Sequence, residues 1–554
     1  MADELGQSTE HRRTQSSAFR WQLSTVLSGL MLVVAAIFFA LHFVHLAADF
    51  PNHSPWVDWS KYTDEGWYGD AAARKMLFGN WYFAGDFNPA VALPVWPLLE
   101  FALFKATGVS IVAARALTLC VFALGIAGFY VLICKFTRPR SEGSGRPLAA
   151  AITVLLLCVS PYFFVFERLA ILEPLVVTLT VWALIAAAHL HPPHLRPWKN
   201  WLPSIALGLL LVGMILTKTT ALFLVPAVAY MVWSRAGYRL RPALKLAALP
   251  GGLALGLWLA YFVLLVRPHY LADFHYLFSA NGYTGIMLDP LEKVVLNTLT
   301  DGMWMGPVLY PAFFVVLGLS LFWRPRLFAN PAFVALLLWA GGYFAFLGYH
   351  NNLQPRYYTV VAAPLTAIVA LGIDAFRQAS ARRADILGGI LAACAVLAIA
   401  VPDAIQQIGY VLHPEYTLLH AAQEVRSVVL SDPSHPELIL SISGSDITMM
   451  TGLRSIDDDF GTMELVDRVK AYRPGWYVAW NELDDDKMDA LSTIYRIQRV
   501  AAFPAMDDPD RNLLIVYRLD PKDATPPVKG RRRPLPKALR TRLGQQPSVD
   551  QLEH

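Results

Sequence analysis

Eleven long stretches of this chain contain no Asp, Glu, Lys or Arg, and this feature restricts the possible folds most. A helix needs about 20 mostly apolar residues to cross the hydrocarbon core of a bilayer. A shorter stretch can still span the core when flanking residues extend its helix, because the apolar stems of Lys and Arg can lie in the hydrocarbon while their charged ends reach the interface. The sequence therefore predicts eleven spanning helices, at 21–48, 116–134, 147–166, 174–195, 201–217, 219–234, 246–266, 302–323, 327–355, 357–373 and 386–402.

The composition supports a membrane protein. Hydrophobic residues make up 55% of the 554 residues and charged residues only 16%, against about 25% charged residues in soluble domains. This excludes a disordered chain, a nucleic-acid binder with a basic face and an ordinary soluble enzyme. The four cysteines lie in or beside apolar stretches, so we expect small buried side chains and no disulfide framework: Cys120, Cys134, Cys158 and Cys394.

The stretch 89–107 is ambiguous, because it is apolar but contains two prolines, Glu100 and Lys105. It is either a twelfth span or a helix in the interface. If it does not cross, one set of connections after residue 134 carries 15 Lys and Arg and the other set carries 5. The richer set should be cytoplasmic, together with the basic N-terminus. We therefore expect eleven spans, a cytoplasmic N-terminus and an external C-terminal part.

The resulting layout has four parts. Residues 1–20 form a cytoplasmic tail, and 21–403 form an all-α membrane domain with a first external loop at 49–110. Residues 404–520 alternate helical and strand patterns, which predicts a small external α/β domain. Its expected helices are 416–429, 462–472 and 484–494, and its expected strands are 437–443, 476–480, 497–503 and 513–517. The proline-rich, basic segment 521–554 is predicted to be disordered.

Ionisable residues at the outer ends of the spans are the candidates for chemistry, since charge at membrane depth is costly and often marks a site. In the first external loop, Asp64 and Glu65 begin an expected helix over 64–77, with Thr63 as its cap and Tyr68 on the same face as Asp64. Gly66 and Gly69 weaken this prediction. Taken alone, acidic residues at a helix start are typical of any helix.

Three further clusters are expected on the same membrane face. Arg168 and Glu173 lie between the third and fourth spans, Lys218 lies in a very tight turn, and Arg356 follows His350 and precedes Tyr357. Each has an ordinary explanation as a helix-end or anchoring charge. Together they suit one reaction, in which a carboxylate activates an acceptor while cations hold a phosphate leaving group. A lipid-linked sugar phosphate fits, because its phosphate lies at headgroup level.

These motifs, in this order, resemble those of the integral-membrane glycosyltransferases of class C (the GT-C fold). The resemblance is to the branch that contains the protein O-mannosyltransferases and the lipid A aminoarabinose transferases, and it covers about 21–400. The motifs that carry it are Asp64-Glu65 with Tyr68, Gly108 with Arg115, Ser160-Pro161 with Arg168 and Glu173, Leu216-Thr217-Lys218, and Arg356-Tyr357 with Pro364.

The resemblance implies inverting transfer from a polyprenyl-phosphate sugar to a periplasmic lipid, glycan or protein. Asp64 would be the base, and Glu65 would orient it or the sugar. Glu173 would be a further catalytic residue, and it stands, one methylene longer, where the family usually has Asp. The donor phosphate would be bound by four cationic residues, Lys218, Arg356, Arg115 and Arg168. Three further residues would contact the substrate: Tyr68, Tyr357 and His350. The family's double proline is split here into Pro94 and Pro97, which leaves the shape of the first external loop open.

No metal or other cofactor is required by this interpretation. Asp457–Asp459 and Asp484–Asp486 are expected to form solvated turns and helix starts rather than a metal site. The expected location is a bacterial inner membrane, and the expected partners are the lipid-linked donor, the acceptor and membrane lipids. The rival interpretations are a transporter or flippase of a lipid-linked glycan, which would place charges near the middle of the bilayer, and a scaffold whose external domain acts alone.

Overall fold

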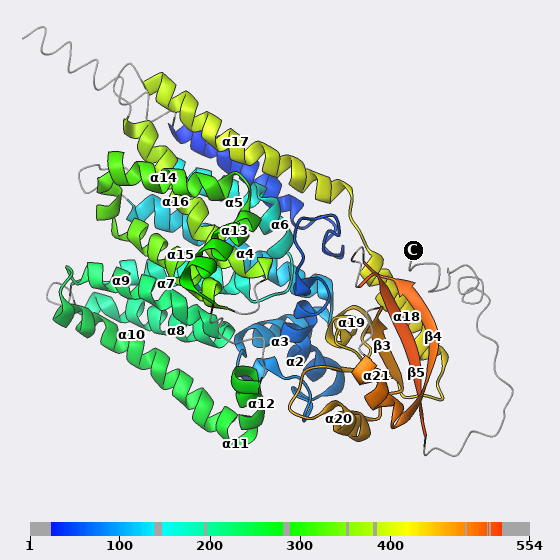
Figure 1. Ribbon diagram of the computed structural model, residues 1–554. Coiled ribbons are helices and arrows are strands. Elements are labelled where there is room, and N and C mark those ends of the chain that lie inside the picture. The colour runs from blue at the N-terminus through cyan, green and yellow to red at the C-terminus, as the bar shows by residue number, and fades with distance from the viewer. Residues whose placement is uncertain are drawn as a thin grey trace, which may run out of the picture.

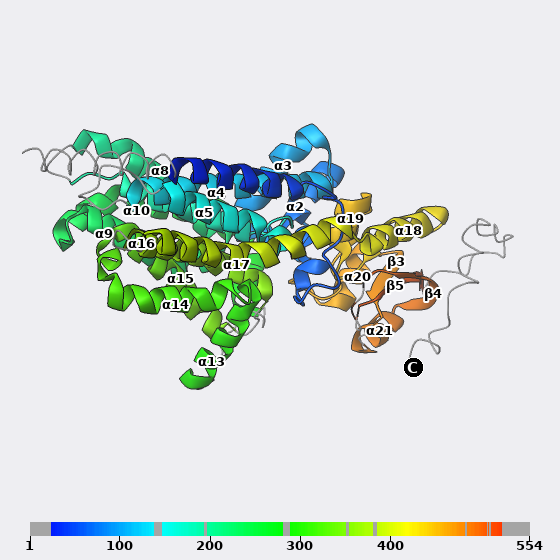
Figure 2. The ribbon, with the colours of Figure 1, turned by 90° about the horizontal axis from the view of Figure 1, so that it is seen from above.

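The structure, a computed structural model, describes residues 24–137, 147–192, 197–280, 289–350, 354–379, 385–481, 485–506, 508 and 511–522. It consists of a bundle of long helices with a smaller α/β domain at one end (Figure 1). Seen from above, the helices of the bundle run side by side and the sheet lies beyond their ends (Figure 2). The predicted tail 521–554 falls almost entirely outside the described residues.

Every predicted apolar stretch contains a helix. They are Ser24–Leu41, α4 (Ile111–Phe136), α5 (Pro147–Val159), α7 (Glu173–Ala188), α8 (Trp201–Thr217), α9 (Val225–Arg235), α10 (Leu240–Tyr261), α14 (Leu309–Trp323), α15 (Pro331–Tyr349), α16 (Thr359–Ala379) and α17 (Asp385–Leu412). In the described part of the chain, seven helices are long and apolar enough to cross a membrane. The protein is therefore a multi-pass membrane protein.

The remaining helices are shorter than the sequence predicted. Pro161 separates α5 from the short α6 (Pro161–Phe166), and α7 has 16 residues. An eighth membrane-length unit is the pair Leu291–Met305 and Leu309–Trp323, which is bent by 116°. α5 and α7 lie almost wholly buried inside the bundle, so neighbouring protein rather than lipid surrounds most of their surface.

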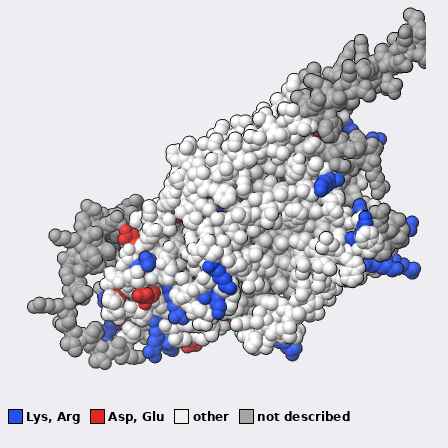
Figure 3. Space-filling model, turned by 180° about the vertical axis from the view of Figure 1, so that it is seen from behind, with Lys and Arg blue, Asp and Glu red and all other residues white. Residues whose placement is uncertain are grey.

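The surface charges are distributed unevenly between the middle and the ends of the molecule. In Figure 3 the broad middle of the molecule is nearly free of charged side chains, and charges gather toward its two ends. Many large apolar side chains of the bundle are exposed, for example Leu264, Phe322 and Trp323.

Cys120 and Cys394 are also exposed, contrary to the expectation of burial, whereas Cys158 is buried. A small thiol on a lipid-facing helix surface has no water to avoid, so exposure costs little there.

The first loop folds into short helices at one end of the bundle. They are η1 (Trp59–Lys61), α2 (Asp64–Phe78), η2 (Pro89–Val91) and α3 (Val95–Thr107). α3 has 13 residues and packs against α2 and α4, and it is not among the membrane-length helices of the described chain. Pro94 is the N-cap residue of α3 and Pro97 lies in its first turn, where proline is tolerated.

The C-terminal domain is built on a five-stranded sheet with the order β2-β1-β3-β5-β4. Its strands are β1 (Ile439–Leu440), β2 (Ser455–Ile456), β3 (Trp476–Trp480), β4 (Tyr495–Pro504) and β5 (Leu513–Pro521). β1 pairs in parallel with β2 and β3, and β5 pairs antiparallel with β3 and β4. The helices are α18 (Thr417–Ser431), α19 (Gly444–Thr451), α20 (Leu465–Tyr472) and α21 (Asp485–Ser492). α17 extends to Leu412, past the predicted boundary at 404, and the sequence analysis did not predict α19 or β2.

Helix α19 docks the C-terminal domain onto α2 at two glycines. A Cβ atom at Gly66 would lie 2.2 Å from the backbone nitrogen of Asp446, and one at Gly69 would lie 2.9 Å from the sulfur of Met449. These glycines lower the intrinsic helix propensity of α2. Their missing side chains allow the two helices to approach closely, so tertiary packing outweighs the local propensity.

We predict that Gly66→Ala separates the two domains. The added methyl group meets backbone atoms, which cannot move aside as a flexible side chain can, so we expect a loss of about 1–3 kcal/mol. Limited proteolysis of the purified protein should then release the C-terminal domain faster. Gly256→Ala in α10 is the control, since no atom lies within 4 Å of its Cβ position. Equal proteolysis of both variants would contradict this account of the interface.

Candidate functional site

The N-terminus of α2 carries the first predicted residue, Asp64. The helix spans Asp64–Phe78, one residue longer than predicted, and ends at Gly79 with φ 82°. Thr63 is the N-cap residue but makes no side-chain capping bond. Its hydroxyl instead donates to the Trp59 carbonyl at 2.9 Å. Asp64 and Tyr68 lie one turn apart on α2, where the sequence predicted a shared helix face, and both line the same cavity.

Arg356 holds Asp64 in place from across the bundle. It is the second residue of the short helix Pro355–Tyr358, which leads into α16. Its Nη2 lies 2.7 Å from Oδ2 of Asp64, and its Nη1 lies 2.5 Å from Oδ1 of Asp58. The backbone N–H of Arg356 also donates to Oδ2 of Asp58 at 2.9 Å. All three side chains are at least 95% buried, so this is a desolvated ion triad rather than a surface salt bridge.

Lys218 and Glu173 form a second buried ion pair beside the first. Glu173 is the first residue of α7, and Lys218 lies in an extended conformation between α8 and η4 (Thr219–Leu224). The Lys218 ammonium nitrogen lies 4.2 Å above the centre of the Tyr357 ring, and the Arg356 guanidinium carbon lies 4.6 Å from that centre. The Tyr357 ring therefore makes a cation–π contact with both cations.

Asp64, Lys218, Arg356 and Tyr357 line one cavity of about 300 Å³, whereas their partners Asp58 and Glu173 are not among its lining residues. This volume is at the lower end of the range for small-molecule pockets. Its polar wall contains Asp64, Lys218, His350 and Arg356. The rest of the wall is mostly aromatic and apolar, and includes Trp59, Trp67, Tyr68, Phe87, Leu172, Phe278, Phe346, Tyr357 and Phe460. The four predicted clusters, around Asp64, Glu173, Lys218 and Arg356, thus meet at the end of the bundle next to the C-terminal domain.

The environment of Asp64 makes its carboxylate a stronger base than usual. Burial raises the pKa of Asp64 to about 6, the positive charge of Arg356 opposes this shift, and the negative charge of Asp58 adds to it. A carboxyl group with this pKa is ionised near neutral pH and can accept a proton from a hydroxyl group.

Two predicted site residues, Glu65 and Arg115, instead form a buried clamp. Arg115 Nε and Nη2 donate to the two carboxylate oxygens of Glu65 at 2.8 and 2.6 Å. Arg115 also donates to the carbonyls of Leu46 and Ala48, and Glu65 accepts the N–H of Ala170. Neither side chain lines the cavity. The pair joins α2, α4 and the segment before α7, so it fixes the position of the helix that carries Asp64.

Arg168 also lies away from the cavity. Its guanidinium group stacks over Phe164, 4.4 Å from the ring centre, and donates to the carbonyls of Val44 and His45 at 2.9 and 2.6 Å. These carbonyls follow the first helix, so Arg168 ties that helix end to the bundle. Of the four residues predicted to bind phosphate, only Lys218 and Arg356 line the cavity.

The sequence analysis missed Asp58 and Phe460. Asp58 is 1% exposed and holds both the side chain and the backbone of Arg356. A signal was present, because an aspartate between Trp56 and Trp59 must find a partner if those aromatic residues are buried. Phe460 comes from the C-terminal domain and lines the cavity, and no local pattern indicated this.

The described residues contain no group of three or more His, Cys, Asp or Glu side chains placed to hold a metal ion. The run Asp457–Asp459 was expected to be solvated, but Asp457 and Asp458 are buried. The Asp457 carboxylate accepts hydrogen bonds within a turn at the domain interface. Asp484 lies outside the described residues.

Comparison with solved structures shows which fold this is. ArnT from Cupriavidus metallidurans in the apo state aligns over 88% of this chain and 98% of its own, with a TM-score of 0.55 and 13% identity. The same protein bound to undecaprenyl phosphate aligns over 89% and 97%, with a TM-score of 0.54 and 15% identity. The chain has the GT-C fold. The oligosaccharyltransferase AglB from Archaeoglobus fulgidus, solved with an inhibitory peptide and a dolichol-phosphate, aligns over 85% and 73%, with a TM-score of 0.50 and 13% identity. Neither a family model nor a curated protein sequence matches the chain.

We predict that the clamp stabilises the fold. Arg115→Ala leaves the buried Glu65 carboxylate without its partner, which typically costs about 3–5 kcal/mol. Thermal unfolding of the detergent-solubilised protein should show this loss. The double variant Glu65→Gln/Arg115→Gln removes both charges and should lose less than Arg115→Ala. A normal melting temperature for Arg115→Ala would contradict the structural role.

Proposed function

We propose that this protein is a glycosyltransferase that moves a sugar from a polyprenyl-phosphate donor to an acceptor hydroxyl group. The observation that carries this proposal is the pairing of a buried carboxylate, Asp64, with two cations, Lys218 and Arg356, on one wall of one cavity. The GT-C fold supports it, and so do the neighbours whose structures hold undecaprenyl phosphate and dolichol-phosphate.

Asp64 acts as the general base. The acceptor O–H transfers its proton to the Asp64 carboxylate as the acceptor oxygen forms a bond to the anomeric carbon of the donor sugar. The bond between that carbon and the phosphate oxygen breaks, and its electron pair leaves with the polyprenyl phosphate. Attack opposite the leaving group inverts the configuration of the anomeric carbon.

Lys218 and Arg356 stabilise the charge that develops on the leaving phosphate. In the structure they are paired with carboxylates, Lys218 with Glu173 and Arg356 with Asp58 and Asp64. The donor phosphate must therefore compete with these carboxylates. When it draws Arg356 toward itself, it weakens the ion pair that holds Asp64 and leaves that carboxylate available to the acceptor.

Glu65, Arg115 and Arg168 are positioning residues in this mechanism. Tyr357 supports both cations with its ring face, and Tyr68 and His350 border the space for the sugar. Glu173 keeps Lys218 extended toward the cavity. The reaction needs no metal for these steps, since the two cations already face the cavity.

We place the cavity on the periplasmic face of a bacterial inner membrane. The basis is the excess of Lys and Arg in one set of connections, which is a mark of cytoplasmic loops. The first loop and the C-terminal domain then lie outside.

A transporter is the rival interpretation, and it would also use a broken span such as the bent pair at 291–323. A transporter would place its charges near the middle of the bilayer, whereas the charges of this cavity lie at helix ends.

We expect Asp64→Asn to lower kcat for sugar transfer by about 10²–10⁴-fold, because the amide cannot accept the proton. The measurement is release of undecaprenyl phosphate from undecaprenyl-phosphate sugars by the purified protein in lipid nanodiscs. Asp467→Asn in α20 is the matched control, since this aspartate is exposed. Wild-type turnover by Asp64→Asn would rule out the assigned base.

The pH dependence of kcat/KM should show an acid limb near pH 6. Below the raised pKa of Asp64, about 6, the base is protonated, so activity falls as the pH drops and is full above about 7. Asp58→Asn removes a negative charge that raises this pKa, so the limb should move to lower pH. An acid limb at the same pH in both proteins would mean that another group titrates.

A further inference from the structure

One wall of the cavity comes from the C-terminal domain. Phe460 meets Trp67 of α2 and Phe87 of the first loop in an aromatic trio, with ring centres 5.1 and 5.3 Å from that of Phe460. The Trp67 and Phe87 centres lie 5.2 Å apart. All three rings line the cavity. Trp67 is three residues after Asp64, so the trio lies close to the proposed base.

Asp457 holds the turn that places Phe460. Its Oδ1 accepts the backbone N–H groups of Asp459 and Phe460, both at 2.7 Å. Its own N–H donates to Oδ1 of Asp86 in the first loop at 3.0 Å. The turn is therefore fixed to the first loop rather than only to its own domain.

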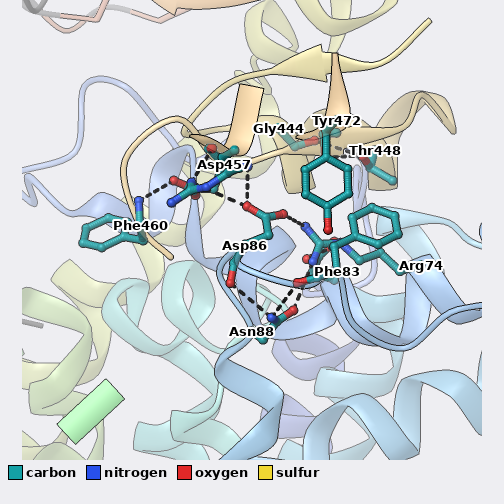
Figure 4. A network of polar contacts seen from close by, with 12 residues as sticks. Arg74, Phe83, Asp86, Asn88, Gly444, Thr448, Asp457, Phe460 and Tyr472 are labelled. Carbon is teal, nitrogen blue, oxygen red and sulfur yellow. Dashed lines mark hydrogen bonds and ion pairs between the residues drawn. The ribbon is translucent and has the colours of Figure 1, made fainter. Parts of the chain in front are cut away.

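A buried ionic network around Asp86 supports this attachment (Figure 4). Arg74 of α2 donates to Asp86 at 2.5 Å, and its Nε lies 2.7 Å from Asp70. On the other side, Arg468 of α20 donates to the carbonyls of Asp457 and Met463 at 2.6 and 2.7 Å. Each of these charged groups is buried, so losing one partner would be costly.

The backbone on the far side of Phe460 is fixed as well. Gly461 has φ 145°, and a Cβ there would lie 2.3 Å from the Arg468 side chain and 2.6 Å from the Gly85 carbonyl. The N–H of Met463 donates to that same carbonyl at 2.9 Å. The segment 457–463 is thus held against the first loop at several points, and Phe460 is presented by a rigid support.

We propose that the trio Trp67, Phe87 and Phe460 is the acceptor-binding platform, and that it stacks on a pyranose ring of a glycan acceptor. This proposal rests on the proposed function. A pyranose ring has a C–H face that packs on aromatic rings, whose faces are electron-rich, and hydroxyl groups that need polar partners. Thr219, Thr220 and His350 supply hydroxyl and imidazole groups to the same cavity. The indole N–H of Trp67 is already donated to the Ile442 carbonyl at 3.2 Å, so Trp67 offers its ring.

The position of the trio favours the acceptor over the donor sugar. Lys218 and Arg356, which bind the donor phosphate in our proposal, belong to the membrane bundle, and the polyprenyl chain reaches them from the bilayer. Phe460 lines the cavity and belongs to the C-terminal domain, which lies at one end of the bundle (Figure 1). A water-exposed glycan reaches that side without passing through lipid.

The test is saturation-transfer difference NMR on the full chain in lipid nanodiscs, with methyl mannoside, glucoside and galactoside as probes. For at least one probe we expect ring C–H signals from the wild-type protein. Phe460→Leu keeps an apolar side chain in the interface and should weaken binding about tenfold, as expected for the loss of one stacking ring. Phe460→Trp should retain binding. Leu430→Ala, at an exposed position of α18, is the control and should bind as the wild type does.

Three results would overturn the proposal. The first is equal binding by wild type and Phe460→Leu. The second is binding of a Ser/Thr peptide and of no glycoside. The third is loss of the glycoside signal when Asp64→Asn protein is loaded with an undecaprenyl-phosphate sugar, because the trio would then hold the donor sugar. A protein that binds glycosides through Phe460 but never cleaves a lipid-linked sugar would contradict the proposed function alone.

Discussion

The placement of Arg356 between Asp58 and Asp64 is the interaction on which the site depends. A guanidinium group this deeply buried must be balanced by carboxylates, and both come from the first loop. The triad therefore fixes that loop to the start of α16 and sets the ionisation of Asp64 at the same time. Lys218 and Glu173 repeat the arrangement beside it. The site is thus stabilised by the same charges that its chemistry requires.

The sequence predicted the elements of the fold well, because helix formation in lipid depends on local composition. Each apolar stretch contained a helix, and α2 was predicted to within one residue despite Gly66 and Gly69. Lengths were harder to predict: α5 and α7 are surrounded by protein, and there a helix need not match the thickness of a bilayer. The boundary at residue 404 was also misplaced, since α17 continues to Leu412 although its last residues are polar enough to suggest a new domain.

The candidate site was predictable only where a residue's position was unusual by itself. Lys218 in a tight turn and the isolated Arg356 were singled out as charges at the ends of apolar stretches, and both line the cavity. Glu65, Arg115 and Arg168 carried the same kind of signal and turned out to bind backbone and each other. Local sequence does not distinguish these outcomes, because partners such as Asp58 and Arg356 are 298 residues apart. Phe460 was missed for the same reason, since only the domain interface brings it to the cavity.

The charged residues of the cavity, Asp64, Lys218 and Arg356, come from three points along the chain, and its aromatic wall is completed by Phe460. During synthesis, the emerging chain exposes Asp64 long before the ribosome has made Arg356 or Phe460. A partly made protein consequently has neither the cations nor the closed pocket. The pocket forms only after segments made late in translation have packed against the first loop.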